Sequence, residues 1–221
     1  MDIVYLKTYS APPIDRKEIL RYASAAEGLS EVEHLLDACL EELGDKLTYK
    51  VCFCELPIEK KVDGVNLGFA EVTSEDLKKN LDGCERIVLF AATVGIAIDR
   101  LIARYTRSSP AKALLIQAIG AERIEALCDV FNHEIADEKK REGLYTRPRF
   151  SPGYGDFSIA HQKKIFDVLD CPRKIGASLN ESLLMSPSKS VTAIIGLSKH
   201  PSERISGCKA FQKNCSYRRI I

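Results

Sequence analysis

Hydrophobic positions recur at helical spacing along much of the chain. The longest run begins at Ser109-Pro110, where the serine suits an N-cap and the proline suits the first helical turn, and it ends by Gly143. Glu125 lies on the margin of its apolar stripe. Capping-box spacing and apolar periodicity predict shorter helices from Asp15, from Ser30, from Ser74, after Gly95 and from near Ser158.

Three other stretches have the patterns of strands. Residues 47–54 alternate between large apolar and other side chains, which predicts a strand with one buried face. Residues 87–92 are continuously apolar, which predicts a strand buried on both faces. A third strand is predicted over 190–198. Because no repeat or clear boundary divides the chain, we expect one domain over residues 1–198, followed by a basic tail over 199–221.

Composition excludes several classes of protein. A chain of 221 residues is long enough to bury one sizeable core. Its 32 lysines and arginines nearly cancel its 31 aspartates and glutamates, which argues against nucleic acid or an anionic membrane as the main partner. No apolar run reaches the roughly 18 residues of a spanning helix. The chain does not begin like a signal peptide, so we expect a soluble, cytoplasmic protein.

The eight cysteines fall into different settings. Five lie among apolar residues, and we expect these to be free thiols that pack as small hydrophobic side chains: Cys39, Cys52, Cys54, Cys84 and Cys128. Cys208 and Cys215 lie in the polar, basic tail and are weak metal candidates. Even with His200 they fall short of the four ligands of a closed zinc site, so a flexible tail or docking element is the favoured interpretation.

The segment from Arg147 to Asp156 carries the clearest chemical signal. Its prolines and glycines require an extended or turning loop. Arg149 offers a planar fork suited to a carboxylate, Gly153 permits close backbone approach, and Tyr154 adds a flat face with a polar tip. With the backbone around Ser151, these groups suit a small zwitterionic ligand with an aromatic end. The alternative is a structural turn whose arginine pairs with a surface acid.

Two further segments allow both a functional and a structural interpretation. Glu181 and Ser182 could cap a helix or hydrogen-bond a ligand, while Met185 followed by Pro187 indicates a packed turn. Gly95 lies between an apolar strand and a helix, where a backbone cradle for an anion is possible, but close packing explains the glycine equally well.

Taken together, two motifs resemble the activation domain of cobalamin-dependent methionine synthase. They are Arg149-x-Ser151-Pro152-Gly153-Tyr154 and, about 25 residues later, Glu181-Ser182-x-x-Met185-x-Pro187-x-x-Ser190-Val191. That family carries an Arg-x-x-x-Gly-Tyr loop and a Thr-Glu-Ser-x-x-Met-x-Pro-x-x-Ser-Val segment, whose threonine is replaced here by Asn180. The resemblance covers about residues 120–195 well, and the length is similar to that of the subfamily in which the domain is a separate polypeptide.

The resemblance implies a single α+β domain, with a central antiparallel sheet flanked by helices, that binds S-adenosylmethionine. It implies a methyltransferase component that acts only with a partner, a cobalamin-dependent methionine synthase lacking its own activation domain. In this family inactive cob(II)alamin, carried by the partner, is returned to methylcobalamin by S-adenosylmethionine and an external electron donor such as a flavodoxin. No catalytic side chain is implied, because the sulfonium methyl is already electrophilic and the protein's work is positioning.

Carried over by motif, Arg149 would contact the methionyl carboxylate, and the backbone at Ser151, Gly153 and Tyr154 would hold the adenosyl part. Glu125 matches, to within one residue, a family glutamate that faces the ligand. Glu181 of the second motif completes the implied S-adenosylmethionine-binding set.

The tail departs from the family. A ligand-binding tyrosine is implied shortly after the last strand, but this chain has Ile205 and Ser206 there. Either Tyr217 takes the role or the affinity for S-adenosylmethionine is reduced.

Two other functions stay open: a component of another S-adenosylmethionine- or corrinoid-linked methyltransferase, and a non-catalytic docking module that has lost the ligand.

Overall fold

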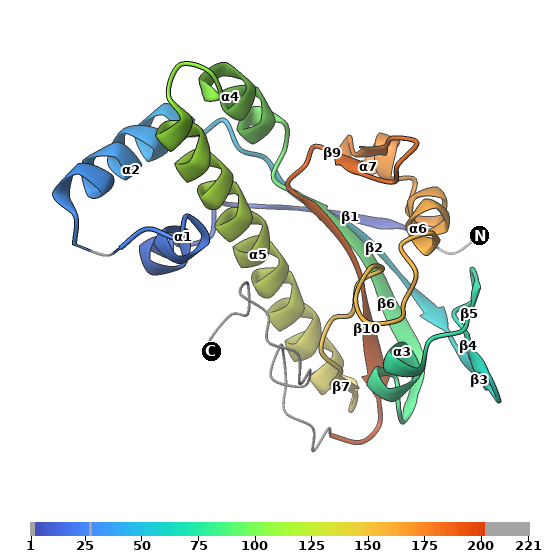
Figure 1. Ribbon diagram of the computed structural model, residues 1–221. Helices are drawn as coiled ribbons and strands as arrows, with labels where there is room; N and C mark the ends of the chain where they lie inside the picture. Colours follow the sequence, from blue (N-terminus) through green and yellow to red (C-terminus); the bar gives the residue numbers. More distant parts are fainter. Residues whose placement is uncertain (1–2, 27, 202–221) are drawn as a thin grey trace.

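The computed structural model describes residues 3–26 and 28–201. Its centre is a five-stranded antiparallel sheet in the order β1-β2-β6-β10-β7 (Figure 1). The three inner strands are long because each crosses the whole domain. The strands are β1 (Tyr5–Tyr9), β2 (Tyr49–Pro57), β6 (Cys84–Thr93), β10 (Ser190–Ser198) and β7 (Tyr145–Thr146).

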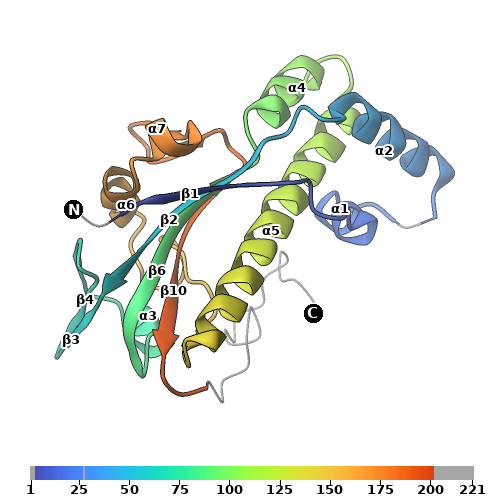
Figure 2. The same ribbon diagram turned by 180° about the vertical axis from the view of Figure 1, so that it is seen from behind.

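Helices cover both faces of this curled sheet (Figure 2). One face carries the 32-residue helix α5 (Pro110–Arg141) together with α1 (Arg16–Tyr22), α2 (Ser30–Leu43) and α4 (Ala97–Tyr105). The other face carries α3 (Glu75–Asn80), α6 (His161–Leu169) and α7 (Cys171–Ile175). Alternate residues of β6 therefore enter two different cores; Phe90, for example, packs against Phe131 of α5 with the rings tilted and their centroids 4.8 Å apart. This is the α+β single domain that the resemblance implied.

The structure corrects one strand prediction. We expected β2 to have one buried face, but Cys52 and Cys54 are as fully buried as Val51 on the opposite face. Helix α7 packs against the face that bears the cysteines. Strand β2 therefore has a neighbouring strand on each edge and a hydrophobic core on each face. The prediction that residues 87–92 are buried on both faces is confirmed.

The sequence patterns did not predict several short strands. Strands β3 (Glu59–Lys61), β4 (Gly64–Asn66) and β5 (Glu71–Val72) form a small second sheet, and β8 (Ser178–Leu179) pairs with β9 (Met185–Ser186). Two or three residues are too few to show a period. Of the predicted helix starts, Asp15 accepts a hydrogen bond from the Glu18 amide as expected, whereas the N-cap before Ser30 is Leu29.

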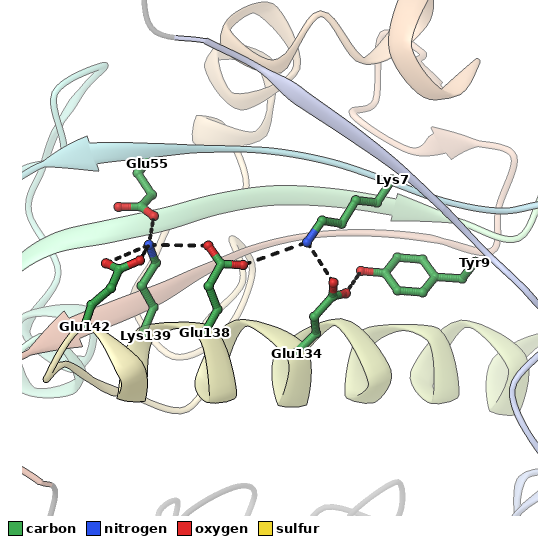
Figure 3. Close-up of polar contacts among 7 residues, drawn as sticks. All are labelled: Lys7, Tyr9, Glu55, Glu134, Glu138, Lys139 and Glu142. Atoms are coloured by element: carbon green, nitrogen blue, oxygen red, sulfur yellow. Dashed lines mark hydrogen bonds and ion pairs between the residues drawn. The ribbon is translucent and has the colours of Figure 1, made fainter.

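Charged side chains fix the second half of α5 against β1 and β2 (Figure 3). The Lys139 side chain, only 5% exposed, forms ion pairs with Glu55 and with Glu142 at 3.0 Å. One to two turns earlier, Glu134 pairs with Lys7 at 2.9 Å and accepts a hydrogen bond from Tyr9. Burial of charge is tolerated here because each buried group has an opposite partner.

The predicted hydrophobic role of the five cysteines is confirmed, since all five are free and buried. Burial raises the pKa of Cys84 to about 11 and that of Cys128 to about 12, so both stay protonated thiols. Cys208 and Cys215 lie outside the described residues. None of the described helices has the length and apolar character needed to cross a membrane.

Gly95 has a packing role. Its φ is +83°, and a Cβ there would lie 2.5 Å from Thr48 Oγ1. Its N–H donates to Thr93 Oγ1 at 3.2 Å. The glycine thus lets the segment before α4 approach Thr48, the residue before β2, which favours the close-packing interpretation over an anion cradle.

We expect Gly95→Ala to lower the free energy of unfolding by about 1–3 kcal/mol, through backbone strain and the clash with Thr48. Urea denaturation measures this. Gly143→Ala is the matched control, because Gly143 has φ +76° but no atom within 4 Å of the added Cβ. Equal losses in the two variants would show that the contact with Thr48 contributes nothing.

Candidate functional site

The site is organised around Arg149, three residues after β7. Its guanidinium forms an ion pair with Glu125 and a second one with Asp129, with Nη1 2.8 Å from Asp129 Oδ1. The Asn132 amide, in the orientation that satisfies its neighbours, accepts from Nη1 at 2.8 Å and donates to the Cys128 carbonyl. The structure thus brings Arg149 and Glu125, two of the site residues expected from the sequence, into direct contact.

This ion cluster is partly enclosed. The side chains of Arg149, Glu125 and Asp129 are 22%, 29% and 36% exposed. Burial disfavours the charged guanidinium, but the acidic groups around it outweigh that effect and raise the pKa of Arg149 above its ordinary value. With two carboxylates to one guanidinium, the cluster carries a formal charge of −1. A ligand carboxylate would have to share Arg149 with these acids.

A tight bend follows the ion cluster. Phe150 exchanges two 2.9 Å hydrogen bonds with Ile194 of β10, which fixes where the bend begins. Gly153 has φ +95°, and its N–H donates to the Phe157 carbonyl at 2.7 Å. The Tyr154 N–H donates to the Ser151 carbonyl at 3.2 Å, and the Tyr154 side chain is exposed. A ligand at this bend would therefore have to use groups other than these two N–H groups, such as the Tyr154 ring.

Glu181 lies elsewhere, in the turn between β8 and β9. It is exposed, and within the part of the chain that the structure describes it forms no ion pair with Arg149. Asn180, which replaces the family threonine, closes this turn by accepting from the Leu184 N–H at 2.9 Å. Gln162 of α6 donates to the Leu183 carbonyl at 2.8 Å. Because the bend leads into α6, which begins at His161, both motifs adjoin the start of one helix.

A groove of about 640 Å³ runs along the second half of α5 and has Arg149 and Asn132 in its wall. His133 and Asp137 of α5 line it on one side, and Tyr145 of β7 lines it on the other. Its volume lies within the range of small-molecule sites. The groove is open to solvent and meets the ion cluster at Arg149, while Glu125, Asp129 and Tyr154 are not among its described lining residues.

Sequence reasoning missed Asp129 and Asn132. They follow Glu125 by four and seven residues on α5, so all three side chains share one face of the helix. That spacing was a usable signal, because a carboxylate and an amide in line with Glu125 define a polar stripe next to the apolar stripe of the helix.

The fold and the groove define a small α+β domain with a ligand-sized site at the edge of its sheet. Residues 59–214, more than two thirds of the chain, match the model of the family described as vitamin B12 dependent methionine synthase, activation domain. The chain therefore belongs to this family. The match begins earlier and ends later than the motifs alone indicated, and it extends into the tail.

A solved structure has the same fold. It is described as the crystal structure of the MetH reactivation domain bound to AdoHcy, and it superposes with a TM-score of 0.64. The similarity covers 91% of this chain and 80% of that one at 16% sequence identity, which establishes the fold.

Proposed function

We propose that this chain is an S-adenosylmethionine-binding reactivation component of cobalamin-dependent methionine synthase. It would support the reductive methylation of cob(II)alamin to methylcobalamin in a partner that carries the corrinoid and lacks its own activation domain. The electron would come from an external donor of the flavodoxin kind. The chain's own contribution would be to bind and orient the methyl donor and to keep water away from it.

The observation that carries this proposal is the meeting of Arg149 with Glu125 beside the groove. S-adenosylmethionine carries an ammonium, a sulfonium and a carboxylate, and supplies an electrophilic methyl group when bound. The cluster offers both signs of charge to such a ligand, with the carboxylates of Glu125 and Asp129 for its cations and Arg149 for its anion. The exposed ring of Tyr154 offers a stacking surface for the adenine.

The test has two steps. Calorimetric titration with S-adenosylmethionine measures ligand binding by the chain alone. The chain is then added to a corrinoid-loaded methionine synthase lacking its activation region, with a reductant and S-adenosylmethionine, and the visible spectrum reports conversion of cob(II)alamin to methylcobalamin. We expect conversion only when all components are present. Binding without conversion would favour a methyltransferase with another acceptor.

A second candidate is supported by a specific contact. Arg149 is already neutralised by two acids, as in the structural alternative considered from the sequence. A docking module that kept the fold and lost the ligand would have this arrangement. Absence of heat at millimolar S-adenosylmethionine, together with retained association with the synthase, would favour it.

A further inference from the structure

Asp156 connects the bend to a separate element of the fold. Its carboxylate accepts hydrogen bonds from the Ser74 hydroxyl and from the amides of Glu75 at 2.7 Å and Asp76 at 3.2 Å. These groups form the start of α3, which lies beside the bend in Figure 1. Hydrogen bonding, above all from Ser74, lowers the pKa of Asp156, so the carboxylate stays ionised near neutral pH.

The anchoring element is rigid. Ser74 is only 2% exposed, and its hydroxyl also accepts from the Leu77 N–H at 3.0 Å. Leu77 is fully buried in the core between α3 and the sheet. Asp156 itself is exposed, so its position depends on these polar contacts and not on burial.

The neighbours of Asp156 show that the bend is fitted to α3. Gly155 has φ +54°, and a Cβ there would collide with the Asp76 carboxylate. Phe157 is buried against Phe150 and accepts the Gly153 N–H. The segment from 153 to 157 is thus closed on itself by two hydrogen bonds, from the Gly153 N–H to the Phe157 carbonyl and from the Phe157 N–H to the Tyr154 carbonyl at 3.0 Å. Three more tie it to the start of α3.

We propose that Asp156 is a positioning residue for the ligand: by capping α3 it holds the Gly153–Tyr154 bend in the conformation that receives S-adenosylmethionine. This inference rests on the proposed function. It adds a residue that supports ligand binding without touching the ligand itself. Without the carboxylate the three donors at the start of α3 lose their acceptor, and the bend keeps only its internal hydrogen bonds. The bend would then have to become ordered when the ligand binds, and the free energy that this costs would weaken the affinity.

Asp156→Ala is expected to weaken S-adenosylmethionine binding about tenfold in calorimetric titration, and Asp156→Asn, which keeps one acceptor oxygen, by less. Ser74→Ala should add no further loss in the Asp156→Ala background, because both residues act through one contact. Asn66→Ala is the matched control. Asn66 also accepts a loop amide, from Gly68 at 3.0 Å, but in the second sheet. The Asn66→Ala variant should bind S-adenosylmethionine as tightly as the unmodified chain does.

Amide hydrogen exchange provides a readout that does not need the ligand. Exchange at Gly153 and Phe157 should be faster in Asp156→Ala and unchanged in Asn66→Ala, with thermal unfolding confirming that both fold. If the unmodified chain binds S-adenosylmethionine and Asp156→Ala binds equally well, the inference is overturned while the proposed function stands. If no variant binds, the proposed function fails, and unchanged exchange at the bend would overturn the anchoring role as well.

Discussion

Replacing Arg149 by alanine is expected to weaken S-adenosylmethionine binding by about 1.5–3 kcal/mol, the cost of losing a hydrogen bond to a charged group. The same change leaves Glu125 and Asp129 facing each other without their shared cation. Their repulsion should also lower the free energy of unfolding. Calorimetric titration and urea denaturation measure the two effects separately.

A second substitution distinguishes two roles for Arg149: contact with the ligand, and holding Glu125 and Asp129 in place. In Arg149→Ala/Asp129→Asn the repulsion is removed, so stability should recover. The affinity for S-adenosylmethionine should stay low if Arg149 itself contacts the carboxylate of that ligand. Recovery of affinity along with stability would mean that Arg149 only holds the two acids in place. An affinity unchanged in Arg149→Ala would contradict any role in binding.

Lys139→Met is expected to lower the free energy of unfolding by about 3 kcal/mol, because it leaves Glu55 partly buried without its lysine. Arg86 remains 2.6 Å from Glu55, which keeps the loss at the lower end of the range for broken buried pairs. The α5 residues drawn in Figure 3 would then keep their contacts with Lys7 and Tyr9 of β1 but lose the contact with β2. Denaturant titration at neutral pH gives the value.

Two variants control for the loss of a lysine as such. Lys163→Met removes an exposed lysine of α6 and should change stability by less than about 0.5 kcal/mol. Adding Glu55→Gln to Lys139→Met removes the uncompensated charge and should restore part of the loss. A loss as small in Lys139→Met as in Lys163→Met would show that the network is not stabilising.

Elements with long, regular patterns were predictable from the sequence. The apolar run of β6 and the stripe of α5 each determine burial by themselves, whatever packs against them. The second buried face of β2 was not predictable in this way. Cys52 and Cys54 were expected to pack as small hydrophobic side chains, but alternation with larger apolar residues predicted a single buried face. What buries them is α7, more than 100 residues away in the sequence. Strand β1, with Tyr5 and Leu6 about half exposed, has no clean alternation and is placed by pairing with β2.

The sequence indicates the residue types of the candidate site, but not the contacts that these residues make. The bend and Arg149 follow from local sequence, because proline and glycine restrict the backbone there. The state of the guanidinium depends on Asp129, which is 20 residues earlier on another element. The position of the Asp156 carboxylate depends on a hydrogen bond from Ser74, 82 residues earlier. Such contacts are set by tertiary packing, which a motif does not encode.

The pairing of β6 with β10 has a consequence for folding. Thr93 pairs with Ser190, so a growing polypeptide must extend by almost 100 residues before β6 obtains its second neighbour. Until then the edge of a strand with a continuous apolar run over residues 87–92 is exposed to other nascent chains. Contacts of such long sequence separation slow folding, and a fragment released before Ser190 would present that edge permanently and aggregate.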